Sequence, residues 1–164
     1  MRIIQISDMH GNDGLIEQIA GEIRSADLII LSGDITNFGG KRRAAAIVEA
    51  VAELNPNLLA VPGNCDRAGV AEYLDEAGIS VDGVVRNVRG YAVCGLGGSL
   101  PAPVKTPTEF SEDEYADRFE RLAADFDAVD IAVIHQPPAD SKLDRVNSGD
   151  HVGSKAVRDF LEAS

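Results

Sequence analysis

Short apolar runs alternate with amphipathic stretches over the first half of the chain. Each run is four residues long and rich in Ile and Leu, which is typical of a buried strand. Between the runs, apolar residues recur at helical spacing, and Gly78 follows the last of these stretches as a helix terminator. Strands that alternate with helices predict a parallel sheet. The expected strands are Ile3–Ile6, Leu28–Leu31 and Leu58–Val61, and the expected helices span 13–23, 41–54 and 67–77.

The pattern changes in the second half of the chain. Two short apolar runs flank Arg89-Gly90, which predicts a tight hairpin, so an antiparallel element joins the parallel ones. Ser111 and Glu114 have the spacing of a capping box at the start of a charged helix. The elements expected here are the strands Val84–Val88, Tyr91–Cys94 and Ile131–Ile134 and the helices 112–124 and 154–163.

The last predicted helix has an apolar face that no later strand completes. A helix that crosses a sheet normally returns the chain to a neighbouring parallel strand, and none follows here. We therefore expect residues 1–164 to form a single domain that is truncated at its C-terminus. The apolar face consists of Ala156, Val157, Phe160 and Leu161.

Composition and charge narrow the classes of protein. With 45% hydrophobic residues, a chain of 164 can bury an ordinary core. The net charge of −12 repels phosphate backbones and argues against bulk nucleic-acid binding unless metal ions invert the local sign. No apolar run approaches the ~18 residues that cross a bilayer, and the N-terminal pattern is not that expected of a signal peptide. Two cysteines fit a reducing compartment, so we expect a cytoplasmic protein without membrane attachment.

Four predicted strands end in side chains that can bind a metal ion. Asp8 and His10 follow the first strand, Asp34 the second and Asn64 the third, and His135 directly follows Ile131–Ile134. In α/β sheets, ligands bind beyond the carboxyl ends of the strands. Carboxylates, imidazoles and an amide oxygen together suit Mn²⁺, Fe, Ni²⁺ or Zn²⁺. The alternative is that the acidic residues cap helices and the asparagine forms a turn, but the set as a whole favours the metal interpretation.

These residues stand in short motifs that resemble those of the calcineurin-like metallophosphoesterases, most closely the short prokaryotic members. The resemblance covers nearly the whole chain in order and spacing. It implies an α/β fold in which two sheets form a sandwich flanked by helices, with the second sheet incomplete at the C-terminus. The motifs are Asp8-x-His10, Gly33-Asp34, Gly63-Asn64-Cys65-Asp66 and the strand-terminal His135.

The resemblance also implies a cofactor of two divalent metal ions and a reaction. Asp8, His10 and Asp34 would hold one ion, and Asp34, Asn64 and His135 the other, with Asp34 bridging the pair. A hydroxide that bridges the two metals would attack the phosphorus of a small phosphodiester or phosphomonoester substrate. The ions would also supply positive charge to an acidic protein that handles an anionic substrate.

The chain departs from the family pattern at Cys65, where many members have a histidine that assists the leaving group. A thiol donates a proton poorly at neutral pH, so we expect good leaving groups or protonation by water; simple packing is the alternative role. Asn12 and Arg67 are candidates for substrate binding at the rim. Asp66 is expected to orient its neighbours, and Arg42-Arg43 to be a solvated charge pair.

A second departure is that the closing Gly-His-x-His motif of the family is absent. We therefore expect low metal occupancy, impaired activity and self-association through the unfinished sheet. Two explanations of the missing motif are open: a truncated chain or gene, or a short form that another chain completes. The functional alternative is a non-catalytic member that binds metal or nucleotide and acts through a partner. A nucleotide-binding module unrelated to hydrolysis is disfavoured by the ligands at the strand ends.

Overall fold

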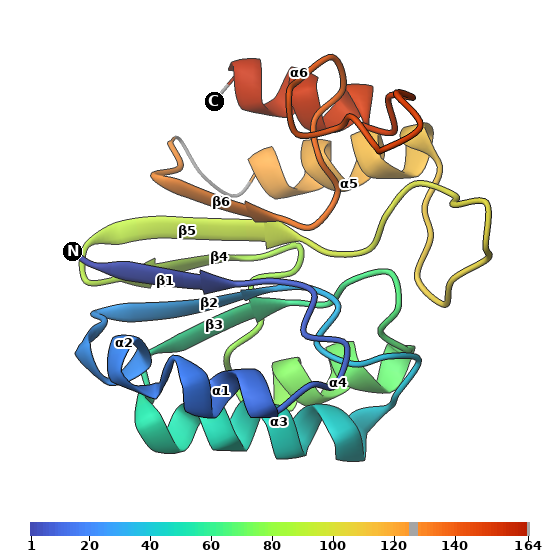
Figure 1. Cartoon of the computed structure of the whole chain (residues 1–164). Helices are drawn as coiled ribbons and strands as arrows, with labels where there is room; N and C mark the ends of the chain where they lie inside the picture. The colour runs from blue at the N-terminus through green and yellow to red at the C-terminus, as the bar shows by residue number, and fades with distance from the viewer. Residues whose placement is uncertain (125–127, 164) are drawn as a thin grey trace.

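The computed structural model of the chain describes residues 1–124 and 128–163, which form four layers: helices, a sheet, a second sheet and helices (Figure 1). Helices α1 to α4 cover one side, and α5 and α6 cover the other. The predicted two-sheet fold is therefore confirmed. The strands are β1 (Ile3–Ile6), β2 (Leu28–Ser32), β3 (Leu58–Val61), β4 (Val85–Val88), β5 (Tyr91–Leu96) and β6 (Ile131–Ile134). The helices are α1 (Gly14–Gln18), α2 (Ala20–Ser25), α3 (Lys41–Leu54), α4 (Ala68–Glu76), α5 (Glu112–Ala123) and α6 (Lys155–Ala163).

The first sheet is parallel, with the strand order β1-β2-β3. Its register pairs Ile29 with Ile4 on one side and with Leu58 on the other. Every residue of the central strand β2 is buried, whereas β1 at the edge is only half-buried. All three carboxyl ends lie at the same edge of the sheet, as parallel pairing requires.

The second sheet has the strand order β4-β5-β6. β4 and β5 form the predicted antiparallel hairpin, with Val88 opposite Tyr91 and positive φ at both Arg89 and Gly90. β6 runs parallel to β5, with Ile134 opposite Leu96. β6 contacts both β2 and β3, and its carboxyl end lies beside that of β2, since His135 Nδ1 is 2.8 Å from the Ser32 carbonyl oxygen.

Alternating residues of β2 divide the hydrophobic core. Leu28 and Ile30 face the second sheet, while Ile29 and Leu31 face the helices α1 to α4. This period of two is what a strand buried on both faces requires. A third cluster lies between the second sheet and α5 and α6, and its Phe119 and Phe160 rings stack with their centroids 4.4 Å apart. Three cores thus hold the four layers in a fixed relation.

The prediction of one continuous helix over 13–23 is wrong. The chain forms two short helices that meet at Ile19, whose φ of −112° is not helical, and the Asp13 side chain makes no capping hydrogen bond. By contrast, both hydrogen bonds of the predicted Ser111–Glu114 capping box are present. No helix among the described residues is long and apolar enough to span a membrane.

The outer edge of β6 carries no further strand among the described residues. A cavity of about 110 Å³ lies along it, lined by Gln5, Ile30 and all four residues of β6. Unpaired backbone groups beside an apolar surface are a template for another strand. We propose that this edge supports the self-association expected from the sequence.

A charge on this edge is expected to weaken such pairing. In sedimentation velocity over a concentration series, Ile131→Lys should raise the dissociation constant of the self-associated form at least ~10-fold. The matched control is Val104→Lys, which places the same charge on a loop residue that is 73% exposed. A wild-type chain that stays monomeric at all concentrations would refute the proposal.

Candidate metal centre

The structure brings together the side chains that follow β1, β2, β3 and β6. Two groups of ligand atoms have all their members within 4.8 Å of one another: one from Asp8, Asp34 and His135, and one from His10, Asp34 and Cys65. Backbone hydrogen bonds join the loops that carry them, from the His10 N–H to the Asp34 carbonyl (2.8 Å) and from the Asp8 N–H to the Gly33 carbonyl (3.1 Å).

Asp34 belongs to both groups and directs one carboxylate oxygen toward each. Its Oδ1 is 3.5 Å from His135 Nε2, and its Oδ2 is 3.6 Å from His10 Nε2. The side chain is only 5% exposed, so few water molecules can solvate its charge. A buried carboxylate with one oxygen toward each of two imidazoles has the geometry of a bridging ligand.

His135 is oriented by a backbone carbonyl. Its Nδ1 lies 2.8 Å from the Ser32 carbonyl oxygen, which can only accept, so Nδ1 donates to it and, in the neutral ring, Nε2 offers a lone pair. That lone pair faces Asn64 Oδ1 at 3.0 Å and Asp34 Oδ1 at 3.5 Å. When the ring is neutral, these three atoms can all direct lone pairs at one cation. The donor set therefore fits a divalent metal ion.

Three of the clustered residues have left-handed backbone conformations that residues other than glycine rarely adopt. Asp8, His10 and Asp34 have φ values of 55°, 47° and 50°. Each such residue costs about 1–3 kcal/mol and persists only where the surrounding structure enforces it. Directing these side chains into one site therefore lowers the stability of the fold.

Two glycines make room for the cluster. A Cβ at Gly33 would overlap the His135 ring, and a Cβ at Gly63 would overlap the backbone and carboxylate of Asp34. Gly33 also has a φ of 101°, which favours glycine. Both residues allow the loops after β2 and β3 to approach closely.

Asp66 binds the same two loops to each other and is completely buried. Its Oδ2 accepts hydrogen bonds from the Gly63 N–H (2.8 Å) and the Ile35 N–H (3.1 Å). Its Oδ1 accepts from the N–H and the hydroxyl of Thr36, both at 2.7 Å. Four hydrogen bonds to one carboxylate fix the loop that carries Asp34 against the loop that carries Asn64, which is the orienting role expected from the sequence.

Cys65 takes part in the cluster through its backbone and its sulfur. Its N–H donates to Asp34 Oδ1 at 2.8 Å, and the Asn64 side-chain amide lies 3.7 Å from Sγ. Burial and the nearby carboxylates, chiefly that of Asp34, raise the pKa of the Cys65 thiol to about 12. Without a cation in the cluster, this thiol is a very poor proton donor.

The two predicted substrate-binding residues lie outside the ligand groups. Asn12 is exposed in the turn after His10, and Arg67 is exposed at the residue that precedes α4. His151 is also separate, because its Nδ1 pairs with the buried Asp144 at 2.8 Å. This pairing agrees with leaving His151 out of the predicted ligand set.

Sequence reasoning missed several contacts that support the site. The Ser32 carbonyl carries no sequence signal, because any residue supplies one. Arg43 is not simply a solvated charge, since its guanidinium donates to the Gly11 carbonyl and pairs with Asp13 at 3.3 Å. Thr108, far along the chain, donates its hydroxyl to the Asp66 carbonyl at 2.6 Å.

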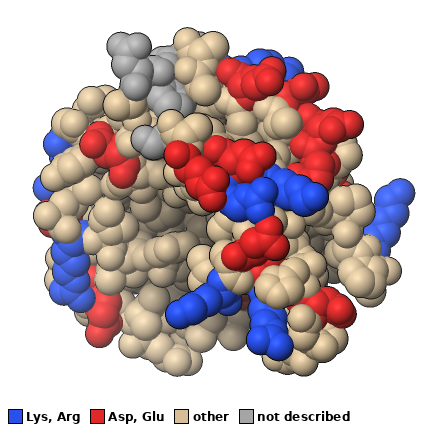
Figure 2. All heavy atoms as spheres, turned by 90° about the horizontal axis from the view of Figure 1, so that it is seen from above, with Lys and Arg blue, Asp and Glu red and all other residues tan. Residues whose placement is uncertain are grey.

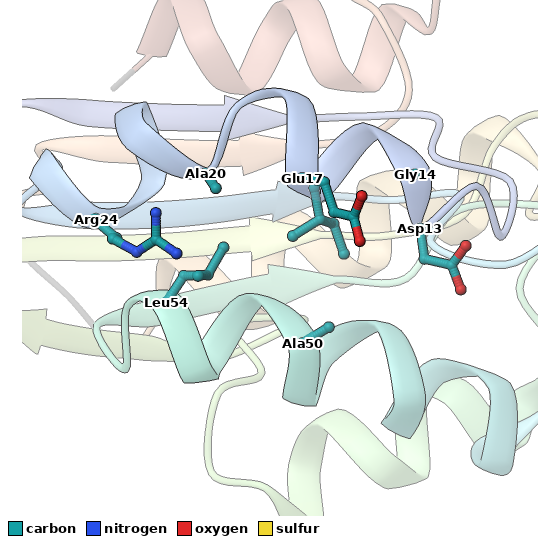
Figure 3. Close-up of a pocket in the computed structure, with 8 residues that line it drawn as sticks. Asp13, Gly14, Glu17, Ala20, Arg24, Ala50 and Leu54 are labelled. Carbon is teal, nitrogen blue, oxygen red and sulfur yellow. The ribbon is translucent and has the colours of Figure 1, made fainter.

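A larger groove lies away from this cluster, between α1, α2 and α3 (Figure 3). It has a volume of about 640 Å³, and none of the predicted site residues lines it. Arg24 lies at one end beside Leu54, Glu17 lies near the middle above Ala50, and Asp13 lies at the other end. The strand-end cluster, not this groove, gathers the groups that can carry chemistry.

Comparisons with known proteins agree with this geometry. The sequence profile of the calcineurin-like phosphoesterases matches residues 1–164. An uncharacterised protein of Methanocaldococcus jannaschii is 32% identical over 167 positions, which cover 99% of this chain and 73% of that protein. The crystal structure of TT1561 from Thermus thermophilus matches with a TM-score of 0.75 at 23% identity, over 99% of this chain and 77% of that one. A second solved structure has a TM-score of 0.81 at 15% identity, over 99% and 79% of the two chains.

The chain belongs to the calcineurin-like phosphoesterase family. The family expected from the strand-end motifs is therefore confirmed, and the two solved structures share its fold. At the level of the family, the activity is metal-dependent hydrolysis of phosphate esters.

The close approach at Gly63 generates a prediction about stability. Gly63→Ala should lower the free energy of unfolding by about 2–4 kcal/mol, because the new Cβ displaces Asp34 and the hydrogen bonds around it. Gly21→Ala is the matched control: it lies in α2 with nothing within 4 Å of the added Cβ and should stabilise by about 0.5–1 kcal/mol. Urea denaturation of both variants measures the difference, and equal effects would contradict the packing argument.

The raised pKa of Cys65 predicts slow alkylation in the absence of metal. A thiol with a pKa of about 12 is ionised at pH 8 in roughly one molecule in ten thousand, and the thiolate is the reactive form. In a Cys94→Ser background, iodoacetamide should modify the folded chain at least ~100-fold more slowly than the urea-unfolded chain. The rate, followed by mass spectrometry, should rise with pH up to the raised pKa; equal rates in both states would contradict this environment.

Proposed function

We propose that this protein is a metal-dependent phosphoesterase that binds two divalent metal ions at the strand-end cluster. The single observation that carries the proposal is the buried carboxylate of Asp34, with Oδ1 toward His135 and Oδ2 toward His10. One carboxylate that serves two imidazoles supports a pair of ions rather than one. Membership of the family supports the class of reaction.

Asp8, His10 and Asp34 would hold one ion, and Asp34, Asn64 and His135 the other. The second set has the support of the convergent lone pairs on His135, Asn64 and Asp34. The first set has the support of His10 Nε2, which lies 3.8 Å from Asp8 Oδ1 as well as 3.6 Å from Asp34 Oδ2. Oxygen and imidazole donors together suit Mn²⁺, Ni²⁺, Fe or Zn²⁺.

When bound, the ions supply Lewis acidity, which activates water and neutralises the phosphate. The residues of the chain position this chemistry. Asp34 fixes the distance between the two halves of the site, and the Ser32 carbonyl keeps the Nε2 lone pair of His135 directed inward. Asn64 would also orient the phosphate, because its side-chain amide lies at the same edge of the sheets. Asn12 and Arg67 at the rim would contact the rest of the substrate.

The surface charge supports a small substrate. On the face above α5 and α6, basic side chains are interspersed with acidic ones rather than gathered into a patch (Figure 2). With a net charge of −12, the protein offers little attraction to a long polyanion. We therefore propose a small phosphate ester as substrate. Cys65 and Cys94 are both free thiols, which agrees with the proposed cytoplasmic location.

Hydrolysis of a bis-aryl phosphate tests the proposal. Mn²⁺ or Ni²⁺ should stimulate turnover, and Asp34→Ala should lower kcat/KM by at least ~100-fold, because it removes the group shared by both ions. Asp75→Ala is the matched control, since it removes an exposed carboxylate of α4 and should leave activity unchanged.

The result separates the proposal from its alternative. Metal binding in calorimetry without turnover on any phosphate ester would identify a non-catalytic member of the family. Turnover that is independent of metal, or equal in Asp34→Ala and the wild type, would refute the two-ion site.

The chemistry of the leaving group gives a second test. Neither imidazole of the cluster is free to donate a proton, because His10 and His135 are proposed ligands. Rates should therefore fall about tenfold or more from aryl to alkyl phosphodiesters, whose alkoxide leaves only after protonation. The same rate for both substrates in the wild type would show that a proton donor exists.

A further inference from the structure

The sulfur of Cys65 lies among the proposed ligands rather than beside them. Cys65 Sγ, a ring nitrogen of His10 and a carboxylate oxygen of Asp34 are all within 4.8 Å of one another. Asp8 joins Asp34 and His135 in the other group, so the two groups share Asp34 alone. The structure thus offers His10 a thiol as a partner in addition to the carboxylate oxygens of Asp8 and Asp34.

We propose that Cys65 is a ligand to the metal ion held by His10 and Asp34, and that its thiolate makes this position selective for Zn²⁺ and Co²⁺ over Mn²⁺. The inference rests on the proposed function, because it concerns one of the same two ions. It assigns to Cys65 a role different from that of a proton donor, since a coordinated sulfur has no proton to give.

The distances suit a small coordination sphere. Around a tetrahedral ion with bonds of ~2.0–2.3 Å, ligand atoms lie ~3.3–3.8 Å apart. His10 Nε2 and Asp34 Oδ2 are already 3.6 Å apart. The three atoms lie within 4.8 Å of one another, which is about 1 Å above the upper end of this spacing.

Two contacts hold the sulfur in place. The Cys65 N–H donates to Asp34 Oδ1 at 2.8 Å, which fixes the cysteine backbone relative to the shared carboxylate. The Asn64 side-chain amide donates toward Sγ at 3.7 Å, a hydrogen bond that a metal-bound thiolate would also accept. Asn64 would therefore contact one ion through its oxygen and support a ligand of the other through its nitrogen.

Binding proceeds without a redox change. The S–H bond breaks, a sulfur–metal bond forms and the proton passes to solvent. The positive ion replaces the proton among the same carboxylates, so the net effect on local charge is favourable. Softer ligands such as thiolate favour zinc and cobalt, whereas manganese prefers oxygen donors, which gives the proposed selectivity.

Cobalt titration tests the ligand directly, because only a cobalt–thiolate bond produces an intense near-ultraviolet charge-transfer band. Metal-free wild type and Cys94→Ser should both develop the band on addition of Co²⁺. Cys65→Ser should bind Co²⁺ with weak visible bands alone, and its preference for Zn²⁺ over Mn²⁺, measured by competition, should fall at least ~10-fold. Cys94 is the matched control, since it is fully buried in another core.

The outcomes distinguish failure of the cysteine ligand from failure of the proposed function. Cobalt binding to the wild type without the band, or a band that persists in Cys65→Ser, overturns the ligand role of Cys65 and leaves the two-ion phosphoesterase standing. Absence of any cobalt, zinc or manganese binding to the wild type overturns the proposed function as well. Circular dichroism checks the fold of each variant, and Cys65→Ala provides a second substitution without a hydroxyl.

Discussion

The structure depends on holding mutually repulsive groups at one edge of two sheets. Carboxylate oxygens of Asp8 and Asp34 lie within 4.8 Å of each other, and His135 Nε2 lies 3.0 Å from Asn64 Oδ1 and 3.5 Å from Asp34 Oδ1. The attraction that holds them comes from elsewhere: four hydrogen bonds to Asp66, the Ser32 carbonyl, and three packed cores. Much of the fold therefore serves to keep the site organised in the absence of an ion.

Most of the fold could be predicted because its signals are local. The apolar runs at β3 and β6 have the bounds that the sequence predicts, and β2 is one residue longer. The interruption at Ile19 was not predictable from periodicity, since the apolar spacing continues across it. Likewise, β1 reads like a buried strand but is half-buried because it lies at the edge of its sheet.

The candidate site could be predicted in its residue types but not in its arrangement. Strand ends share an edge, and that rule alone brings Asp8, Asp34, Asn64 and His135 together. The partner of His10 depends on left-handed backbone at three residues and on the turn at Cys65, and no sequence pattern specifies these. Backbone groups such as the Ser32 carbonyl are invisible to residue-type reasoning for the same reason.

His135 alone among the expected ligands comes from the second sheet; the others follow strands of the first. An ion held by both His135 and Asp34 would thus be a non-covalent cross-link between the two halves of the sandwich. It would bind only when the two halves are docked, and this would couple ion binding to folding by about 2.7 kcal/mol at an ion concentration a hundred times the Kd. Removal of the ion by a chelator would then weaken the packing between the two sheets before either sheet unfolded.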